Sequence, residues 1–185
     1  MYQLDPKTTA LVLIDLQKGI LQLPLQPYSS DEIVARSLKF TEKCRDAGVT
    51  ICLVHVTWNP DMKDVLNSKV DVSMKHAALP EDWAVFTEGL QQPSDLVITK
   101  RQWGAFYGTD LDLQLRRRGI KTVILGGVAT NLGVESTARD TWEHGYDLVI
   151  VEDLCSSFET MMHEFSFQKI FPRISHVEQS TLIEF

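Results

Sequence analysis

"GGVATNLGVESTARD", residues 126–140, follows a short apolar segment and has the composition of a strand that turns directly into a helix. Its opening glycine pair permits a tight backbone turn, and Thr130 and Asn131 are helix-capping residue types. Gly133 then stands in the first helical turn, although glycine costs about 1 kcal/mol relative to alanine in a helix interior. The stretch predicts a strand–turn–helix unit whose helix begins with a residue that has no side chain.

Short apolar segments rich in β-branched residues surround this unit. They are residues 9–15, 49–56, 95–100, 121–127 and 146–153. Near-continuous apolar runs of this length are typical of strands that are covered on both faces, as in a parallel sheet.

Helical patterns alternate with these strands, at residues 30–48, 109–119, 131–145 and 159–171. The first has Ser30 as its expected N-cap and Gly48 as its stop. Alternating strands and helices predict a doubly wound α/β fold. The stretch 57–94 contains three prolines, and we expect an irregular excursion beside the site.

Composition limits the functional classes. The 185 residues, 44% of them hydrophobic, suit one domain over residues 1–185. A net charge of −7 argues against nucleic-acid and anionic-membrane partners, which need a basic surface. The three cysteines have no CxxC spacing, so we expect neither a disulfide framework nor a cysteine-rich zinc site. No apolar run approaches the length of a membrane span, and we expect a cytoplasmic protein.

Three chemically distinct features coincide at the ends of predicted strands. Asp15 ends the first strand, Lys100 ends the segment 95–100, and Gly126 with Gly127 ends the segment 121–127. Ligands of open α/β sheets bind beyond the carboxyl ends of the strands. An acid and a base that face one crevice beside a helix N-terminus form a candidate catalytic constellation.

Three motifs resemble those of the isochorismatase-like hydrolases, a group of nicotinamidases, N-carbamoyl amidohydrolases and true isochorismatases. They are LVLIDLQKG at 11–19, KRQWGAFYGTDL at 100–111 and GGVATNLGVESTARDTWEHGY at 126–146. They follow the family's order, and the resemblance extends over almost the whole chain. It implies a Rossmann-like, six-stranded parallel sheet flanked by helices, and we expect a homodimer or a higher homo-oligomer.

The resemblance also implies roles for individual residues. Asp15 matches the family's acid–base aspartate and Lys100 its lysine. Gln17, Phe106 and the usually cis bond Val128–Ala129 match positions that we expect to line the substrate site, although Gly104 replaces the serine of the family's K-x3-S-A-F pattern.

The resemblance offers a reason for the glycine at position 133 of the opening stretch. In the family's amidohydrolases the position of Gly133 is the nucleophilic cysteine, whose pKa a helix N-terminus lowers. Covalent acyl transfer through a cysteine at this site is therefore excluded. True isochorismatases are similar to this chain in having a small residue there, because they cleave a vinyl ether by proton transfer and water addition.

Other positions bear on metal and substrate binding. Nicotinamidases have metal ligands in a D-W-H-P-like segment, where this chain has Thr57 and Asn59, so we expect neither a metal nor another cofactor. The isochorismatase tyrosine is here Ala129, and no arginine occurs between Arg45 and Arg101. We therefore expect Asn59 and Arg101 to contact the substrate.

The leading hypothesis is a cofactor-independent small-molecule hydrolase that uses Asp15 and Lys100, with the turn at Gly133 binding a substrate anion. Its expected reaction is cleavage of an isochorismate-like vinyl ether. Two alternatives stay open: an amide-type hydrolase that uses activated water, and a binding protein that has lost catalysis.

Overall fold

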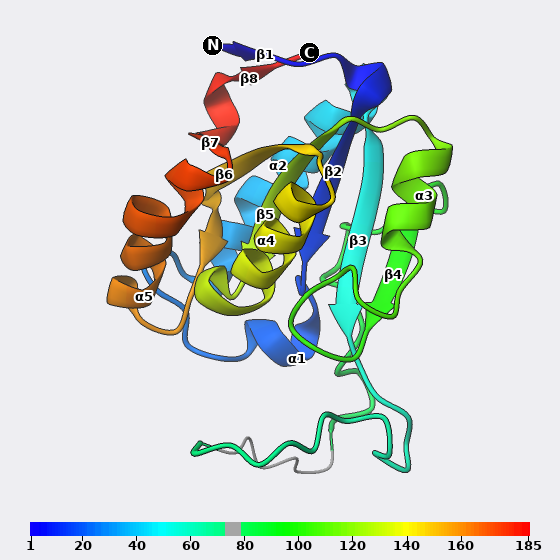
Figure 1. Cartoon of the computed structure of the whole chain (residues 1–185), viewed down its shortest axis with the longest axis vertical. Helices are drawn as coiled ribbons and strands as arrows, with labels where there is room; N and C mark the ends of the chain where they lie inside the picture. Colours follow the sequence, from blue (N-terminus) through cyan, green and yellow to red (C-terminus); the bar gives the residue numbers. More distant parts are fainter. Residues whose placement is uncertain (73–78) are drawn as a thin grey trace.

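A six-stranded parallel sheet forms the centre of the computed structural model, which describes residues 1–72 and 79–185. Its strand order is β4-β3-β2-β5-β6-β7, so the chain first winds outward on one side of β2 and then continues on the other side from β5 (Figure 1). The strands are β2 (Thr9–Ile14), β3 (Thr50–Val56), β4 (Leu96–Lys100), β5 (Thr122–Val128), β6 (Asp147–Ser156) and β7 (His176–Glu178). The predicted α/β fold with six parallel strands is confirmed.

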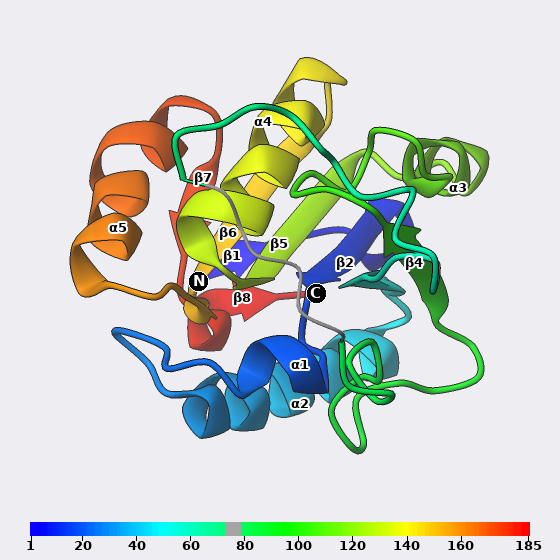
Figure 2. The same cartoon turned by 90° about the horizontal axis from the view of Figure 1, so that it is seen from below.

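Helices cover both faces of this sheet, as Figure 2 shows. The helices α1 (Lys18–Leu21) and α2 (Ser30–Ala47) lie on one face, and α3 (Leu111–Arg117), α4 (Glu135–Glu143) and α5 (Thr160–Phe165) lie on the other. Two π-helical segments, η2 (Thr130–Val134) and η3 (Ser166–Ile170), adjoin α4 and α5. The 3-10 turns are η1 (Pro6–Thr8), η4 (Phe171–Arg173) and η5 (Ser180–Leu182). Near the chain ends, β1 (Tyr2–Gln3) pairs in parallel with β8 (Ile183–Glu184).

The central strand β2 is buried on both faces of the sheet, which explains why its residues are almost uniformly apolar. Val12 and Ile14 point into the core under α3 and α4, while Leu11 and Leu13 point into the core under α2. Alternate side chains of a strand face opposite sides of a sheet, so a strand buried on both sides needs apolar residues at every position.

The winding direction of the chain reverses between β2 and β5, and ligands of open α/β sheets bind at the carboxyl edge beside such a point. Gly127 allows these strands to approach each other at this edge. A Cβ atom on Gly127 would lie 2.1 Å from the carbonyl oxygen of Ile14, and the residue has a φ of 122°. Glycine is therefore required at this position.

The structure corrects two predicted helix starts. Ser29, rather than Ser30, caps α2, and it forms a reciprocal capping box with Glu32. Neither Thr130 nor Asn131 caps a helix, because the N-cap position is Ala129 and these two residues already belong to the π-turn η2. The short strand β7 was not recognised from the sequence, since its three residues give too little pattern.

The excursion at 57–94 contains turns but no helix or strand among its described residues. It leaves the carboxyl end of β3 and extends beyond the body of the molecule (Figure 1). Within the residues that the structure describes, no helix has the length and apolar character needed to cross a membrane.

Candidate active site

Asp15 and Lys100 form a buried ion pair at the carboxyl edge of the sheet. Asp15 follows the last residue of β2, whereas Lys100 ends β4, with β3 lying between the two strands. The flexible four-carbon stem of lysine bridges that gap. Lys100 Nζ lies 2.8 Å from Asp15 Oδ2 and also donates to the Trp103 carbonyl oxygen at 2.8 Å. Asp15 is only 5% exposed, and Lys100 is only 2% exposed.

The surroundings of Asp15 favour its neutral form unusually strongly. Burial raises the pKa of Asp15 to about 6, against the opposing effects of Lys100 and His55. Its backbone has a φ of 53°, in the left-handed region that non-glycine residues rarely adopt. Within the described part of the chain, Asp15 Oδ1 is buried and has no hydrogen-bond partner. One carboxyl oxygen therefore holds Lys100, and the other remains able to exchange a proton.

Gly133 lies directly against this pair. A Cβ atom built on Gly133 would be 3.3 Å from Lys100 Nζ, 3.4 Å from Asp15 Oδ2 and 3.0 Å from Ile14 Cγ2. The backbone of Gly133 thus lies so close to the ion pair that even a methyl group at this position would contact both charged groups.

A compact turn brings Gly133 to this position. The peptide bond between Val128 and Ala129 is cis, and both residues are buried. The Ala129 carbonyl oxygen accepts hydrogen bonds from the N–H groups of Leu132 and Val134, at 3.1 and 3.2 Å. The Thr137 hydroxyl donates to the Gly133 carbonyl oxygen at 2.7 Å. The turn is therefore fixed by the protein's own backbone and hydroxyl groups.

Gln17 is fully buried, and its side-chain amide bonds to main-chain groups. Its side-chain N–H groups donate to the carbonyl oxygens of Val56 and Trp83, at 3.0 and 2.9 Å, and its carbonyl oxygen accepts from the Val56 N–H at 2.8 Å. The amide thus joins the ends of β2 and β3 to the segment 83–87, and the expected contact with substrate stays a prediction.

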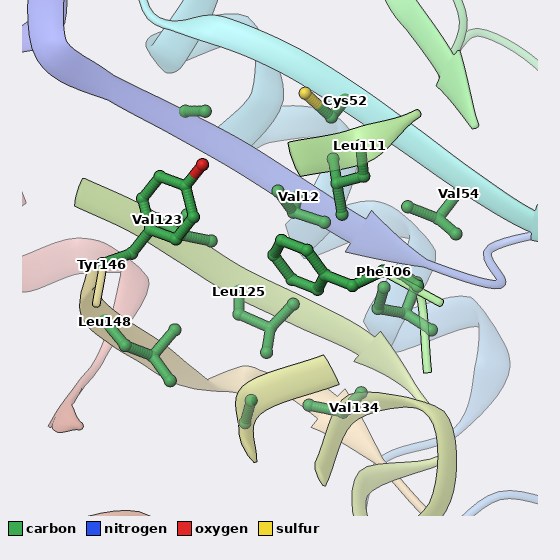
Figure 3. Packing of buried hydrophobic residues seen from close by; sticks show 14 of the residues in the cluster. Val12, Cys52, Val54, Phe106, Leu111, Val123, Leu125, Val134, Tyr146 and Leu148 are labelled. Carbon is green, nitrogen blue, oxygen red and sulfur yellow. The ribbon is translucent and has the colours of Figure 1, made fainter. Parts of the chain in front are cut away.

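Phe106 lies in the core between the sheet and the helices α3 and α4. Its ring packs among Val12, Leu111 and Val134 (Figure 3). It also stacks on the His144 ring, with a centroid distance of 4.8 Å. The ring therefore supports this face of the sheet, and the expected contact with substrate stays a prediction.

Asn59 and Arg101 lie on the excursion and on the loop after β4. Asn59 is exposed, and its backbone N–H donates to the Asp64 carboxylate. The Arg101 guanidinium donates to Asp64 Oδ2 at 2.6 Å and to the Thr57 carbonyl oxygen at 2.8 Å. Arg101 thus ties the first part of the excursion to the loop after β4, and Asp64 balances its charge, while its expected contact with substrate stays a prediction.

Two further features concern groups that a hydrolase could use. Cys44, Cys52 and Cys155 are free and buried. Burial raises the pKa of Cys44 and of Cys52 to about 12 and also raises the pKa of Cys155. In residues 1–72 and 79–185, no group of three or more His, Cys, Asp or Glu side chains is arranged to hold a metal ion.

Sequence reasoning missed the contribution of the segment 83–87. Trp83 packs so closely on α1 that a Cβ atom on Gly19 would lie 2.2 Å from its ring. The Trp83 carbonyl oxygen accepts from the Gly19 N–H, and its indole N–H donates to the Val56 carbonyl oxygen. These contacts involve mainly backbone atoms, which no residue pattern signals. At Gly104, which replaces the serine of the family's pattern, a Cβ atom would lie 2.8 Å from Asp140 Oδ2, the end of a side chain that would have to shift.

Comparisons with known proteins agree with this architecture. The model of the isochorismatase domain matches residues 9–181. An uncharacterized isochorismatase family protein, YecD of Escherichia coli O157:H7, is 50% identical, over 96% of this chain and 95% of its own length. A solved isochorismatase family protein of Burkholderia thailandensis superposes with a TM-score of 0.94 at 43% identity, covering 98% of this chain and 95% of that one.

A more distant relative has a named activity. It is the ureidoacrylate amidohydrolase RutB of Caulobacter vibrioides, 30% identical over 80% of this chain and 77% of its own length. Together with the sheet order and the Asp15–Lys100 pair beside the β5–α4 turn, the match over residues 9–181 shows that the chain belongs to the isochorismatase family.

Proposed function

We propose that this protein is a small-molecule hydrolase that uses Asp15 and Lys100 and forms no covalent intermediate through a cysteine. The observation that carries the proposal is the buried ion pair, in which Asp15 Oδ1 has no partner among the described residues and Gly133 adds no side chain. A carboxyl group with a pKa of about 6 exchanges protons readily near neutral pH.

Cleavage of a vinyl ether is a reaction that a carboxyl group and an ammonium group in this arrangement suit. Protonated Asp15 gives its proton to the terminal carbon of the C=C bond, which leaves an oxocarbenium ion. Water adds to the cationic carbon and returns a proton to Asp15, and the resulting hemiketal separates into a ketone and an alcohol. Lys100 stabilises the carboxylate while the proton is away, because its ammonium group lies 2.8 Å from Oδ2. Gly133 leaves room for the reacting carbon.

An amide-type hydrolysis with activated water is the second candidate, and the amidohydrolase among the relatives favours it. In that reaction ionised Asp15 takes a proton from water, which attacks the carbonyl carbon directly. The two candidates need opposite protonation states of Asp15, so their pH dependences differ in sign.

The decisive experiment is a depletion screen in which the purified protein is incubated with a mixture of vinyl ethers, amides and ureido compounds. Asp15→Asn and Lys100→Met serve as inactive comparators, and Asp31→Asn, an exposed acid on α2, serves as the matched control. We expect one compound class to be consumed by the wild type and by Asp31→Asn. The two site variants should lose on the order of 10²–10⁴ in rate. Wild-type turnover in both site variants would exclude this site.

A binding protein without activity is the remaining alternative. In that case no compound is consumed, but one class of compound raises the melting temperature of the wild type, as any ligand of the native state does.

A further inference from the structure

A chain of three hydrogen-bonded side chains, two of them buried and the third half-buried, extends from the turn at Gly133 to α5 and β6. The Thr130 hydroxyl lies 2.9 Å from His163 Nδ1, and His163 Nε2 lies 3.0 Å from Glu152 Oε1. Thr130 is fully buried and His163 is 3% exposed. Thr130 is the first residue of the π-turn η2, and Gly133 is its fourth.

The chemistry of these groups defines their hydrogen-bond directions. Hydrogen bonds from His163, Gln179 and Tyr28 hold the pKa of Glu152 below its usual range despite its burial, so Glu152 is an acceptor. His163 Nε2 must then carry a hydrogen, and in the neutral ring Nδ1 is an acceptor. With the ring neutral, the Thr130 hydroxyl donates to His163 Nδ1, and the donors of the whole chain point in one direction.

Neighbouring residues of α5 and η3 hold the same segment. The Asn131 side-chain N–H contacts Met162 Sδ at 3.5 Å, and the Ser166 hydroxyl donates to Glu135 Oε2 at 2.7 Å. Met162, His163 and Ser166 therefore contact residues that both precede and follow Gly133 in the sequence. The His163 ring itself is enclosed by Phe167, with a centroid distance of 4.5 Å, and by the edge-on ring of Tyr28.

We propose that His163 is a positioning residue for the candidate active site: held by Glu152, it fixes the Thr130 hydroxyl and thereby the turn that places Gly133 against Asp15 and Lys100. This inference deepens the proposed function and rests on it for its catalytic meaning. His163 contacts neither Asp15 nor Lys100 in the described hydrogen bonds, so it acts through Thr130 alone.

A thiol introduced by Gly133→Cys reports on this position without any substrate. Its Cβ atom would lie 3.3 Å from Lys100 Nζ, whose charge lowers the pKa of a nearby thiol, and 3.4 Å from Asp15 Oδ2, whose negative charge opposes that effect when Asp15 is ionised. The native Cys44 and Cys52 thiols have a pKa of about 12, and burial also raises that of Cys155. The introduced thiol is therefore expected to titrate alone near neutral pH, and ultraviolet absorbance of the thiolate measures its pKa.

The test adds matched substitutions to the Gly133→Cys chain. Thr130→Val keeps the volume of the side chain but removes the hydroxyl, whereas Thr130→Ser keeps the hydroxyl. His163→Phe keeps an aromatic ring but removes both hydrogen bonds. We expect Thr130→Val and His163→Phe each to raise the thiol pKa by about one unit, a tenfold fall in thiolate below the pKa. Thr130→Ser should leave it unchanged, and the Val/Phe double variant should be no worse than either single variant.

Several results would overturn the inference. One is an unchanged thiol pKa in folded Thr130→Val, and another is additive effects of the two substitutions. A third measurement needs no variant: nitrogen-15 NMR of the imidazole should show the Nε2–H tautomer, and the opposite tautomer would contradict the proposed hydrogen-bond directions. If the positioning role of His163 is supported but the depletion screen finds no substrate, the proposed function fails while the positioning role stands.

Discussion

Asp15 combines features that reduce stability and favour chemistry. It has a left-handed backbone and shares a buried ion pair with Lys100. A buried pair often stabilises a protein no better than apolar residues of the same volume would, since both charges lose their hydration. Strained and desolvated groups of this kind gather at functional sites. The loss of stability that the strain and the desolvation bring is therefore a reason to propose that the pair serves a reaction.

The pH dependence of kcat/KM should reveal which form of Asp15 reacts. This ratio reports the ionisation of the free enzyme, in which the pKa of Asp15 is about 6. For vinyl-ether cleavage the protonated form reacts, so we expect a plateau below pH 6 and a roughly tenfold fall per pH unit above it. A profile that instead rises through pH 6 identifies Asp15 as a base and favours the amide-type reaction.

A methyl group at position 133 should separate activity from stability. In Gly133→Ala the new Cβ lies 3.3 Å from Lys100 Nζ and 3.4 Å from Asp15 Oδ2, so it occupies the space proposed for substrate. We expect kcat/KM to fall by about 10²-fold, the usual effect of misplacing reacting groups by about 1 Å. Unfolding in urea should change little, because the helix preference of alanine, about 1 kcal/mol, offsets the 3.0 Å contact with Ile14. Full activity in this variant would show that substrate does not enter there.

At the scale of elements, α2 shows how local sequence defines a boundary. Its N-terminus carries a capping box between Ser29 and Glu32, and it ends at Gly48, which has a φ of 85°. Both signals are local, which is why the sequence located this helix to within one residue.

Removing the cap should weaken the fold without affecting the site. Ser29→Ala deprives the Glu32 N–H of its acceptor, and we expect the free energy of unfolding to fall by about 1 kcal/mol. Urea denaturation measures this change. Ser29→Thr is the control, since it retains a capping hydroxyl and should lose less. An equal loss in both variants would contradict the capping role.

Gln17 joins the ends of β2 and β3 to the segment 83–87. Besides its three side-chain hydrogen bonds, the main chain around it pairs with 83–87: the Lys18 N–H donates to the Val85 carbonyl oxygen, and the Thr87 N–H donates to that of Leu16. The excursion thus returns to the body of the protein at a fixed place.

Gln17→Met should weaken the attachment of the segment 83–87 to the ends of β2 and β3. The substitution preserves volume but leaves the buried Val56 N–H without its acceptor and removes one of the two donors to the Trp83 carbonyl oxygen. We expect a loss of about 1–3 kcal/mol in unfolding free energy, together with faster hydrogen exchange in residues 83–87. Gln22→Met, at an exposed position, is the matched control. Unchanged exchange in Gln17→Met would show that the main-chain pairing suffices.

For the whole molecule, the sequence predicts most of the fold and the centre of the site. Parallel strands buried on both faces give clear apolar runs, and polar residues at their ends converge because the topology brings the ends together. This reasoning correctly places Asp15, Lys100 and Gly133 in mutual contact. It does not reveal the structural partners of Gln17 and Phe106, which are backbone atoms and core side chains distant in sequence.

Self-association is also a property of the whole molecule, and it stays a prediction. Several large apolar side chains are strongly exposed, among them Tyr107 at 81%, Met161 at 70% and Phe165 at 58%. Exposed apolar surface favours association when it is contiguous. We expect a dimer or a larger assembly in sedimentation equilibrium, with Tyr107→Ser and Met161→Ser as separate probes. A monomer at all concentrations would contradict this expectation.

The missing side chain at Gly133 has a consequence for the conditions under which such an enzyme works. A catalytic thiolate is the group in a hydrolase that peroxide attacks first, passing through sulfenic acid to irreversibly oxidised forms. Here the proposed chemistry needs only a carboxyl group and an amine, and the three thiols of the chain are buried with raised pKa values. A hydrolase of the proposed kind would therefore keep its activity under an oxidative stress that inactivates thiol-dependent hydrolases.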